Sequence, residues 1–382
     1  MEILYFSSTG PMVALLQLTL NELGYDAGSP DGIFGQKTLD ALKAFQKNSG
    51  LAENGVVWPQ TWDKLSDVLL THGVYTSIPY SSNILNINLH ALSRRYPFVN
   101  TDIIGYSPLG EAIYRIRIGA GSRALMFNAS HHANEWITSP LLMKYIFELC
   151  AAFDGGEQFD GYDARLLLEN IVLDSVPMVN PDGVDLVTGQ LKKGSAIYNA
   201  ALSMNEPPVP FPDGWKANIR GVDLNLNYPA GWEKARELKF AAGYTAPGPR
   251  DYVGPYPLSE PESAAMAALT EDNDYILTVS LHTQGEVIFW TFEDYKPPRA
   301  LEIGQQMSLA SGYRLDEPGE FSSYAGYKDW FIQQFDKPGY TPECGLGINP
   351  LPIEQFDKIY SDVRPMLTAA AAAIAFGQDE QI

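Results

Sequence analysis

The pattern of apolar and polar residues predicts three short helices within residues 10–70. In each of them, apolar residues recur every three or four positions, which is the spacing of one helix face. The second helix is expected to take Thr38 as its N-cap and to end at Gly50. Three such faces indicate a small helical module. The apolar positions that define them are Val13, Leu16, Leu20, Leu23, Leu39, Leu42, Phe45, Trp62 and Leu65.

Strand-like and helix-like stretches alternate from residue 83 to the C-terminus. Such alternation predicts an α/β domain, with a mixed central sheet and helices on both of its faces. One helix is expected to begin at Ser139 as its cap, with Pro140 at its first position. Strands are expected at residues 113–118, 124–129, 171–178, 275–281 and 286–290, and a C-terminal helix at residues 353–375.

The stretch between these two parts contains Gly73, Pro79 and several serines, and it lacks a periodic apolar face. Such composition is typical of a linker. The predicted organisation is therefore a helical module at residues 1–73, a linker at 74–82 and a larger domain at 83–382.

Composition and charge exclude some classes of function. The 382 residues carry a formal net charge of −20, which argues against a nucleic-acid partner because such binding needs clustered Lys and Arg. The two cysteines, Cys150 and Cys344, are too few for a disulfide framework, so two free thiols are expected. We expect no membrane span and no secretory signal. The protein is then expected in the cytoplasm or the spore, or at the wall if exported by another route.

Candidate metal ligands follow two predicted strands. The strand at residues 124–129 leads into His132 and Glu135, and the strand at 275–281 ends at His282. In open α/β sheets, ligands bind at the carboxyl ends of the strands. Two histidines and one glutamate form a three-ligand catalytic zinc site, with the fourth position left for water. The sequence therefore predicts one zinc ion per chain.

His131 is the competing ligand, because it is adjacent to His132. Its spacing of four to Glu135 makes it more suitable as a hydrogen-bonding neighbour of the ligands, or as a buried residue. A His-x-x-Glu pattern alone also arises by chance. The prediction of a metal site therefore depends on the third ligand, which lies at the end of a second strand.

The first part of the chain resembles the peptidoglycan-binding domains of cell-wall hydrolases. The resemblance rests on Gln17 and Gln46, each followed by a Gly turn at residues 31–32 or 54–55, and on the turn at residues 31–35. These repeated features also indicate a weak internal duplication. The resemblance implies wall contact near that turn, whereas the alternative is a tight turn with Phe34 packed inward. The residues assigned to wall binding are Asp31, Gly32, Phe34 and Gly35.

The larger part resembles the metallocarboxypeptidases related to carboxypeptidase A. The motifs that carry the resemblance are 132–136, 180–183, 221–225, His282 and a late glutamate, Glu343. The resemblance implies zinc binding by His132, Glu135 and His282, and it implies that Glu343 is the general base. It also implies a cation that stabilises the developing oxyanion. Two candidates for that cation stay open, Lys216 and Arg220.

One position departs from ordinary carboxypeptidases. Leu226 stands where they have an Arg that binds the C-terminal carboxylate of the substrate. This change and the first module together resemble the γ-D-glutamyl-L-diamino acid endopeptidases of spore-forming bacteria. Peptidoglycan stem peptides are the implied substrate. The expected substrate-binding residues are Asn225, Leu226, Tyr324 and Lys328, with Lys328 at the pocket floor. The alternatives are a conventional carboxypeptidase, a non-catalytic wall-binding protein and, for Lys328, a solvated loop residue.

Overall fold

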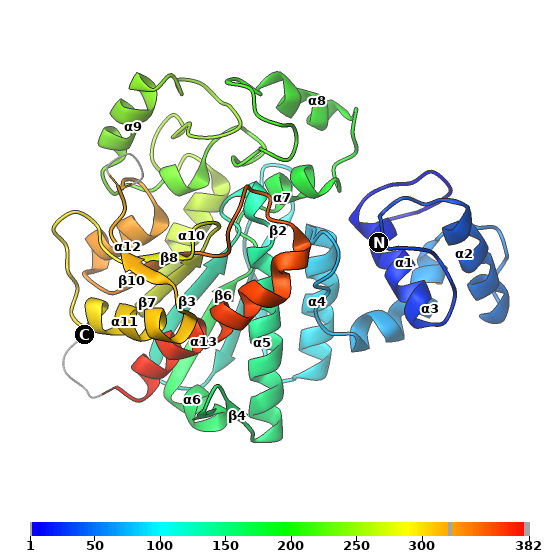
Figure 1. Ribbon diagram of the computed structural model, residues 1–382, viewed down its shortest axis with the longest axis horizontal. Coiled ribbons are helices and arrows are strands. Elements are labelled where there is room, and N and C mark those ends of the chain that lie inside the picture. Colours follow the sequence, from blue (N-terminus) through cyan, green and yellow to red (C-terminus); the bar gives the residue numbers. More distant parts are fainter. Residues whose placement is uncertain (1, 320–322, 378–382) are drawn as a thin grey trace.

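The computed structural model describes residues 2–319 and 323–377. Its largest element is a mixed eight-stranded sheet with the strand order β1-β2-β6-β3-β7-β10-β8-β9 (Figure 1). A separate two-stranded ribbon joins β4 and β5. The strands are β1 Asn100–Tyr106, β2 Ala112–Gly119, β3 Arg123–Ala129, β4 Gln158–Phe159, β5 Tyr162–Asp163, β6 Ile171–Val176, β7 Tyr275–Leu281, β8 Val287–Phe289, β9 Arg314–Asp316 and β10 Gly339–Glu343.

Helices cover both faces of the sheet, as the alternating pattern predicts. Side chains alternate along β3, so that Leu125 and Phe127 join the core under α5 and α13, while Met126 joins the core under α10 and α12. The helices are α1 Pro11–Glu22, α2 Gln36–Asn48, α3 Pro59–Thr71, α4 Ser82–Arg95, α5 Thr138–Gly155, α6 Ala164–Asn170, α7 Pro181–Thr188, α8 Ala196–Ser203, α9 Trp232–Ala241, α10 Pro261–Glu271, α11 Ala300–Ser311, α12 Tyr327–Phe335 and α13 Phe356–Ala375. Across the described ranges, every helix is too short or too polar to cross a bilayer.

The first module consists of α1, α2 and α3, and it contains the predicted repeat. The Gln17 side chain accepts a hydrogen bond from the Gly32 amide at 2.9 Å, and the Gln46 side chain accepts one from the Gly55 amide at 3.0 Å. Each glutamine is buried and also donates to the turn that it holds. Because a buried amide needs partners, these two residues fix two equivalent turns.

Two predicted helix caps are wrong. Thr38 lies inside α2, which begins one turn earlier after Gly35, and its hydroxyl instead accepts a bond from Gln17. Ser139 lies inside α5, whose first residue is Thr138. In both cases a buried polar side chain has a tertiary partner, so its hydroxyl is not needed at the helix end.

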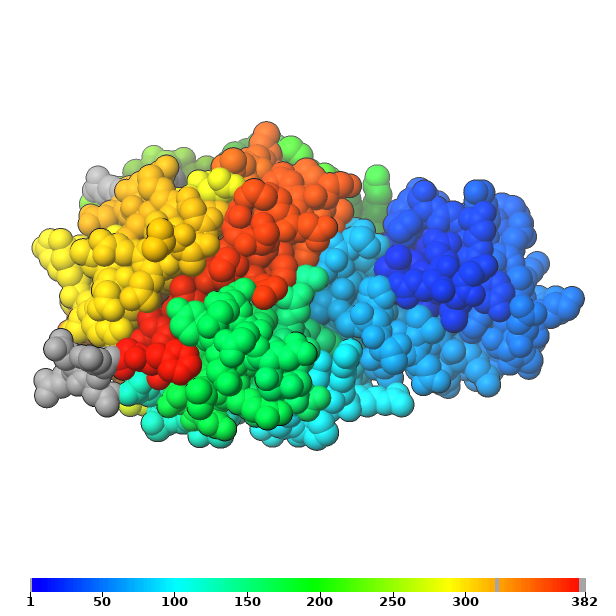
Figure 2. Space-filling view, turned by 60° about the horizontal axis from the view of Figure 1, so that its bottom comes forward, coloured from blue at the N-terminus to red at the C-terminus, as the bar shows by residue number. Residues whose placement is uncertain are grey.

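The segment between the module and α4 is packed. Tyr75, Ile78 and Tyr80 are fully buried, and the Tyr80 hydroxyl donates to Asn88 of α4 at 2.7 Å. Asn88 in turn donates to the carbonyl of Gly73. The module therefore lies against α4 as a lobe at one end of the molecule (Figure 2).

Helix α7 is joined to the start of α4 by one buried carboxylate. Asp185 accepts hydrogen bonds from the backbone amide of Ser82 at 2.8 Å and from its hydroxyl at 2.6 Å. Burial raises the pKa of Asp185 to about 7, although the two bonds from Ser82 oppose this rise. The carboxylate thus helps to fix α4, against which the module packs, to the domain that follows.

The raised pKa of Asp185 makes the stability of the protein depend on pH. Because the folded-state pKa lies above the unfolded value near 3.8, the folded chain holds this proton more tightly. The resulting stability is present at low pH and is lost as the pH rises through about 7. We expect the urea midpoint of the parent protein to fall more between about pH 5 and about pH 8 than that of Asp185→Asn. An equal fall in both proteins would contradict this assignment.

Candidate active site

The predicted metal ligands converge at the carboxyl edge of the sheet. Strand β3 pairs in parallel with β7, and Ala129 lies opposite Leu281 at the ends of the two strands. His282 directly follows β7, whereas His132 and Glu135 lie in the turn after β3. The parallel pairing therefore brings three residues that are far apart in sequence to one point.

The geometry of these three residues fits a metal ion. The Nδ1 atom of His132 lies 2.9 Å from Glu135 Oε1, and the Nδ1 atom of His282 lies 2.9 Å from Glu135 Oε2. The two Nδ1 atoms are 3.0 Å apart, and all three side chains are buried. Among the described residues, they form a group of possible ligand atoms that lie within 4.8 Å of one another. Two imidazoles and one carboxylate are the donor set of a catalytic zinc site.

His131 does not belong to this group. Its Nε2 atom lies 3.0 Å from the Tyr228 hydroxyl, and its side chain is fully buried. Burial and the neighbouring histidines His282 and His132 hold the pKa of His131 well below its usual value. A neutral, buried neighbour of the ligands is one of the two roles that its sequence position allows.

A second carboxylate orients His132. The Nε2 atom of His132 lies 3.1 Å from Asp223 Oδ1, on the side of the ring opposite to Glu135. A carboxylate at that nitrogen fixes the tautomer in which Nδ1 carries the free lone pair, as in many zinc sites. Burial alone would raise the pKa of Asp223, but the charges of Lys216 and His132 hold it well below its usual value. Asp223 therefore stays ionised.

Glu343 lies at the end of β10, next to the third ligand. The amide of His282 donates to the carbonyl of Pro342, and the amide of Cys344 donates to the carbonyl of His282. Glu343 and His132 line one cavity of about 180 Å³. Burial, with repulsion from Glu135, raises the pKa of Glu343 to about 8. A carboxyl group of this kind is suited to accept and return a proton near neutral pH.

The structure separates the two candidate cations. Lys216 lines the cavity, and its Nζ atom lies 3.7 Å from Asp223 Oδ2. Arg220 lies outside the lining of this cavity; its side chain is 54% exposed and faces Glu260 at 3.7 Å. Of the two candidates, only Lys216 lines the cavity, and a role in binding a substrate carbonyl is therefore a prediction for Lys216 rather than for Arg220.

One buried amide holds the loops of the site together. The Nδ2 atom of Asn180 donates to the carbonyls of His131 and Ala217, both at 3.1 Å, and its Oδ1 accepts from the amide of Gly183. Asn180 thus joins the zinc-ligand turn to the segment of Lys216 and also caps α7. The sequence alone gives the 180–183 motif no evident chemical role. In the structure, Asn180 of this motif holds the loop of His131 and the loop of Ala217 at a fixed distance from each other.

The cavity contains three of the four predicted substrate-binding residues. Asn225, Leu226 and Lys328 line it, whereas Tyr324 lies outside the lining and packs edge-on against Phe292. The interpretation of Lys328 as a solvated loop residue is wrong. It lies in α12, is 5% exposed, and has its ammonium group 2.6 Å from Asp329 and 2.5 Å from the carbonyl of Thr291.

Several polar residues of the cavity carry no signal in the sequence alone. Lys239 donates to Asp251 at 2.7 Å, and Arg250 donates to the other carboxylate oxygen of Asp251 at 2.7 Å. The amide of Asp251 donates to Asp223, which connects this group to the zinc ligands. The charged cavity residues to which the sequence assigns no role are Asp223, Lys239, Arg250, Asp251 and Asp329.

In the module, the residues assigned to wall binding are in different environments. Phe34 is 1% exposed and packs inward, whereas Asp31 and Gly32 line a surface cavity. Gly35 precedes α2 as its N-cap. The turn at residues 31–35 is held by Gln17, so part of its sequence pattern is explained by packing.

Comparison with known families agrees with this arrangement. A family model described as zinc carboxypeptidase matches residues 86–331, a range that contains all three proposed ligands. The chain belongs to the zinc carboxypeptidase family. It is therefore a metallopeptidase of a zinc-dependent family, and the described residues include a matching ligand set. A second model, for a peptidoglycan binding domain, matches residues 9–65.

Two bacterial proteins of similar length are similar to this chain over most of its sequence. Gamma-D-glutamyl-L-diamino acid endopeptidase 1 of Lysinibacillus sphaericus is 43% identical over 283 residues, which are 74% of this chain and 70% of that protein. The uncharacterized protein YqgT of Bacillus subtilis (strain 168) is 39% identical over 277 residues, or 72% of each chain. In fold, the chain is similar to the carboxypeptidase A from Helicoverpa armigera, with a TM-score of 0.62 and 20% sequence identity. The superposition covers 99% of this chain and 98% of that carboxypeptidase.

The separation of Lys216 and Arg220 predicts different effects on peptide hydrolysis. We expect Lys216→Ala to lower kcat by about 10²–10³, the range for loss of one group that stabilises an oxyanion. Arg220→Ala should change kcat by less than about threefold, because an exposed ion pair contributes little. Zinc content of both variants is the control. A large loss in Arg220→Ala with intact zinc would contradict the assignment.

For Glu343, we expect the conservative change Glu343→Gln to keep the zinc ion and to lower turnover by about 10²–10⁴, because proton transfer is lost. Metal analysis and turnover would be measured on the same preparation. Removal of zinc by a chelator should abolish hydrolysis in the parent protein, and added zinc should restore it. If Glu343→Gln retains more than about a tenth of the parent turnover, another residue is the base.

Proposed function

We propose that this protein hydrolyses the bond between γ-D-glutamate and meso-diaminopimelate in peptidoglycan stem peptides. The observation that carries the proposal is that Leu226, at the position where the resemblance places a carboxylate-binding Arg, shares a cavity with a Lys328–Asp329 pair. The named activity of the Lysinibacillus sphaericus relative and the peptidoglycan-binding module support it. The proposal includes turnover of the wall in a spore-forming bacterium, the setting that the sequence resemblance predicts.

Each group of the site has a role in this reaction. A zinc ion held by His132, Glu135 and His282 would supply a Lewis acid that polarises the scissile carbonyl and acidifies a water molecule. Glu343 takes the proton of the attacking water and gives it to the leaving amine. Lys216 donates to the carbonyl oxygen as negative charge develops on it.

Leu226 accounts for the loss of exopeptidase binding. Its side chain is 8% exposed and packs with Trp232 and Ala235, so this position offers no charge to a substrate carboxylate. A free terminal α-carboxylate would lose a charge-assisted, bidentate contact there. A stem peptide that continues beyond diaminopimelate does not need this contact, because the corresponding carboxyl group of diaminopimelate is already part of an amide bond.

The Lys328–Asp329 pair is complementary to the side chain of meso-diaminopimelate. That side chain ends in an amine next to a carboxylate. Lys328 would pair with the carboxylate and Asp329 with the amine, so each buried charge would gain an opposite charge from the ligand. Asp329 is fixed for this purpose, because its Oδ2 accepts a bond from the amide of Gly326.

Two alternatives are less well supported by the site. A conventional carboxypeptidase needs a cation where Leu226 lies. A non-catalytic wall-binding protein needs no convergent His132, Glu135 and His282, and burial of such groups is costly without a metal or another partner. The intact ligand set therefore favours an enzyme.

The substrate proposal is tested with small peptides. We expect the parent protein to hydrolyse L-Ala-γ-D-Glu-meso-diaminopimelate faster than a blocked dipeptide that ends in Phe, because both end in a free α-carboxylate and only the first has a side chain that is complementary to Lys328 and Asp329. Lys328→Met, which keeps the side-chain length, should lower kcat/KM for the diaminopimelate peptide by about tenfold or more, since a hydrogen bond to a charged group is lost. Leu226→Arg should improve hydrolysis of the Phe dipeptide.

A matched substrate is the control for this test. The peptide with L-Lys in place of meso-diaminopimelate keeps the amine and lacks the distal carboxylate, so Lys328→Met should have little effect on its hydrolysis. A parent protein that prefers the Phe dipeptide would overturn the proposal in favour of a conventional carboxypeptidase. If Lys328→Met lowers the hydrolysis of both stem peptides equally, Lys328 does not bind the distal carboxylate of diaminopimelate.

A further inference from the structure

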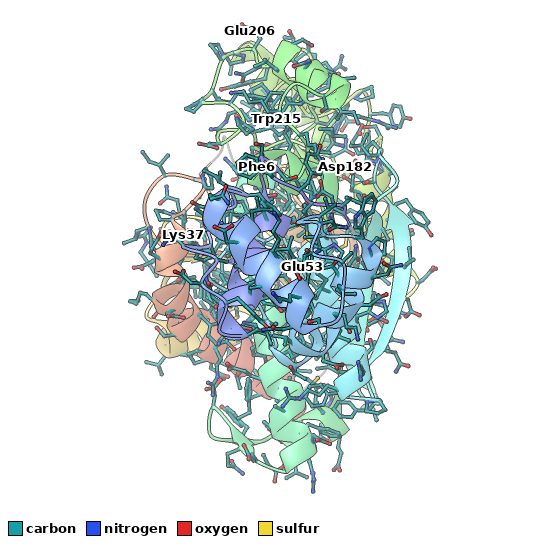
Figure 3. The ribbon with its side chains drawn as sticks, turned by 90° about the vertical axis from the view of Figure 1, so that its right-hand side faces the viewer. Phe6, Lys37, Glu53, Asp182, Glu206 and Trp215 are labelled. Atoms are coloured by element: carbon teal, nitrogen blue, oxygen red, sulfur yellow. The ribbon has the colours of Figure 1, made fainter. Side chains whose placement is uncertain are left out.

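A second cavity lies between the module and the peptidase domain. Its volume is about 610 Å³, and residues of both parts line it. From the module these include Tyr5 and Asp31, and from the peptidase domain they include Thr188, Lys193 and Phe211. Figure 3 looks onto the module, with Phe6 at its upper edge below the segment that carries Trp215. Clefts between domains are common ligand sites.

The walls of this cavity are held in place by direct contacts. Glu2 of the module accepts a hydrogen bond from Gln190 at 3.0 Å and pairs with Lys192 at 2.9 Å. Near them, the backbones of Gly10 and Gly189 approach so closely that a Cβ atom at Gly10 would lie 3.0 Å from the carbonyl oxygen of Gly189. The cavity is therefore formed before any ligand binds.

The chemistry of the walls suits a glycan that carries carboxylates. The Tyr5 side chain is 53% exposed, and its ring is available to pack against a sugar ring. Ser7, Ser8 and Thr9 add hydroxyl groups from the module. On the opposite wall, Lys193 is exposed and has no ion pair within the described ranges. Such a cation can bind a carboxylate.

The cavity is connected to the active site through one aromatic contact. Phe211 lines the cavity and packs edge-on against the buried Trp215, with ring centroids 5.8 Å apart. Trp215 precedes Lys216, which lines the catalytic cavity. Helix α7, which contributes Thr188, also packs against the turn of Glu135. The segment at residues 211–216 therefore lines both cavities, the second through Phe211 and Pro212 and the catalytic cavity through Lys216.

Peptidoglycan contains both of the chemical parts that the two cavities would bind, a glycan and a peptide. In peptidoglycan, L-Ala and γ-D-Glu lie between the glycan and the scissile bond, and each extended residue spans about 3.3–3.6 Å. A strand that occupies both cavities would bind its glycan in the second cavity and a stem peptide near Glu343. A peptidoglycan strand carries several stem peptides, and the free α-carboxylate of D-Glu in a neighbouring stem peptide, which is not the one being cleaved, is a partner for Lys193.

We propose that the cavity between the two domains is a composite binding site for a peptidoglycan strand, in which the module binds the sugars and the peptidase domain binds a stem-peptide carboxylate through Lys193. The inference rests on the proposed function. It differs from wall binding by the module alone, because one wall of the site belongs to the peptidase domain.

The test uses the full chain and measures binding to insoluble peptidoglycan in the Glu343→Gln background, where the wall is not degraded. We expect Tyr5→Ala and Lys193→Glu each to raise the apparent Kd by about fivefold or more. Arg314→Glu is the matched control: Arg314 is an exposed cation on the edge strand β9, and its reversal changes the net charge equally. With stem peptides removed from the glycan, the effect of Lys193→Glu should vanish and that of Tyr5→Ala should remain.

Hydrolysis of the soluble tripeptide by Tyr5→Ala and Lys193→Glu, with Glu343 intact, shows that both variants are folded. We expect kcat/KM to stay within about twofold of the parent, because an exposed side chain outside the catalytic cavity contributes little. If Lys193→Glu binds the wall as well as Arg314→Glu does, or if Tyr5→Ala binds as well as the parent, the composite site is wrong. Failure of the parent to cleave the tripeptide would instead overturn the proposed function, whatever the binding result.

Discussion

The parallel pairing of β3 with β7 is the constraint on which the site depends. Because both strands end at the same edge, with Ala129 opposite Leu281, the turn after each strand delivers a histidine to the same point. A shift of one residue in this register would turn the side chains to the other face of the sheet. The register is held by burial on both faces, so the folding of the core also positions the ligands.

The buried charges of the site depend on one another. His132 lies between Glu135 and Asp223, and Asp223 lies between His132 and Lys216. This series of contacts continues from Asp223 to the backbone amide of Asp251, and the carboxylate of Asp251 pairs with Lys239. Removal of one member would leave a neighbour buried without its opposite charge, which costs more than the lost contact itself. The zinc site and the substrate cavity therefore form one electrostatic unit.

The sequence predicts the fold and the candidate ligands because both depend on local patterns. Alternating apolar stretches mark the strands, and polar residues at their ends mark the site. Asn180 and Asp223 could not be assigned in this way, since their roles are contacts with His131, Ala217 and His132 that only the tertiary structure creates. The cap at Thr38 was wrong for the same reason, because its hydroxyl bonds to Gln17.

The residues that we propose to select the substrate lie on different elements from those that would hold the zinc. The candidate ligands follow β3 and β7, whereas Leu226 ends a short 3₁₀ helix at Leu224–Leu226 and Lys328 lies in α12. Substitution at these positions can change which carboxylate is bound without moving the strand ends, because function varies on loops placed by a rigid scaffold. Recognition of the wall is separated in the same way. Tyr5 and Lys193 line the second cavity and not the catalytic one, so the contacts that we propose with an insoluble polymer are kept apart from the groups that transfer protons.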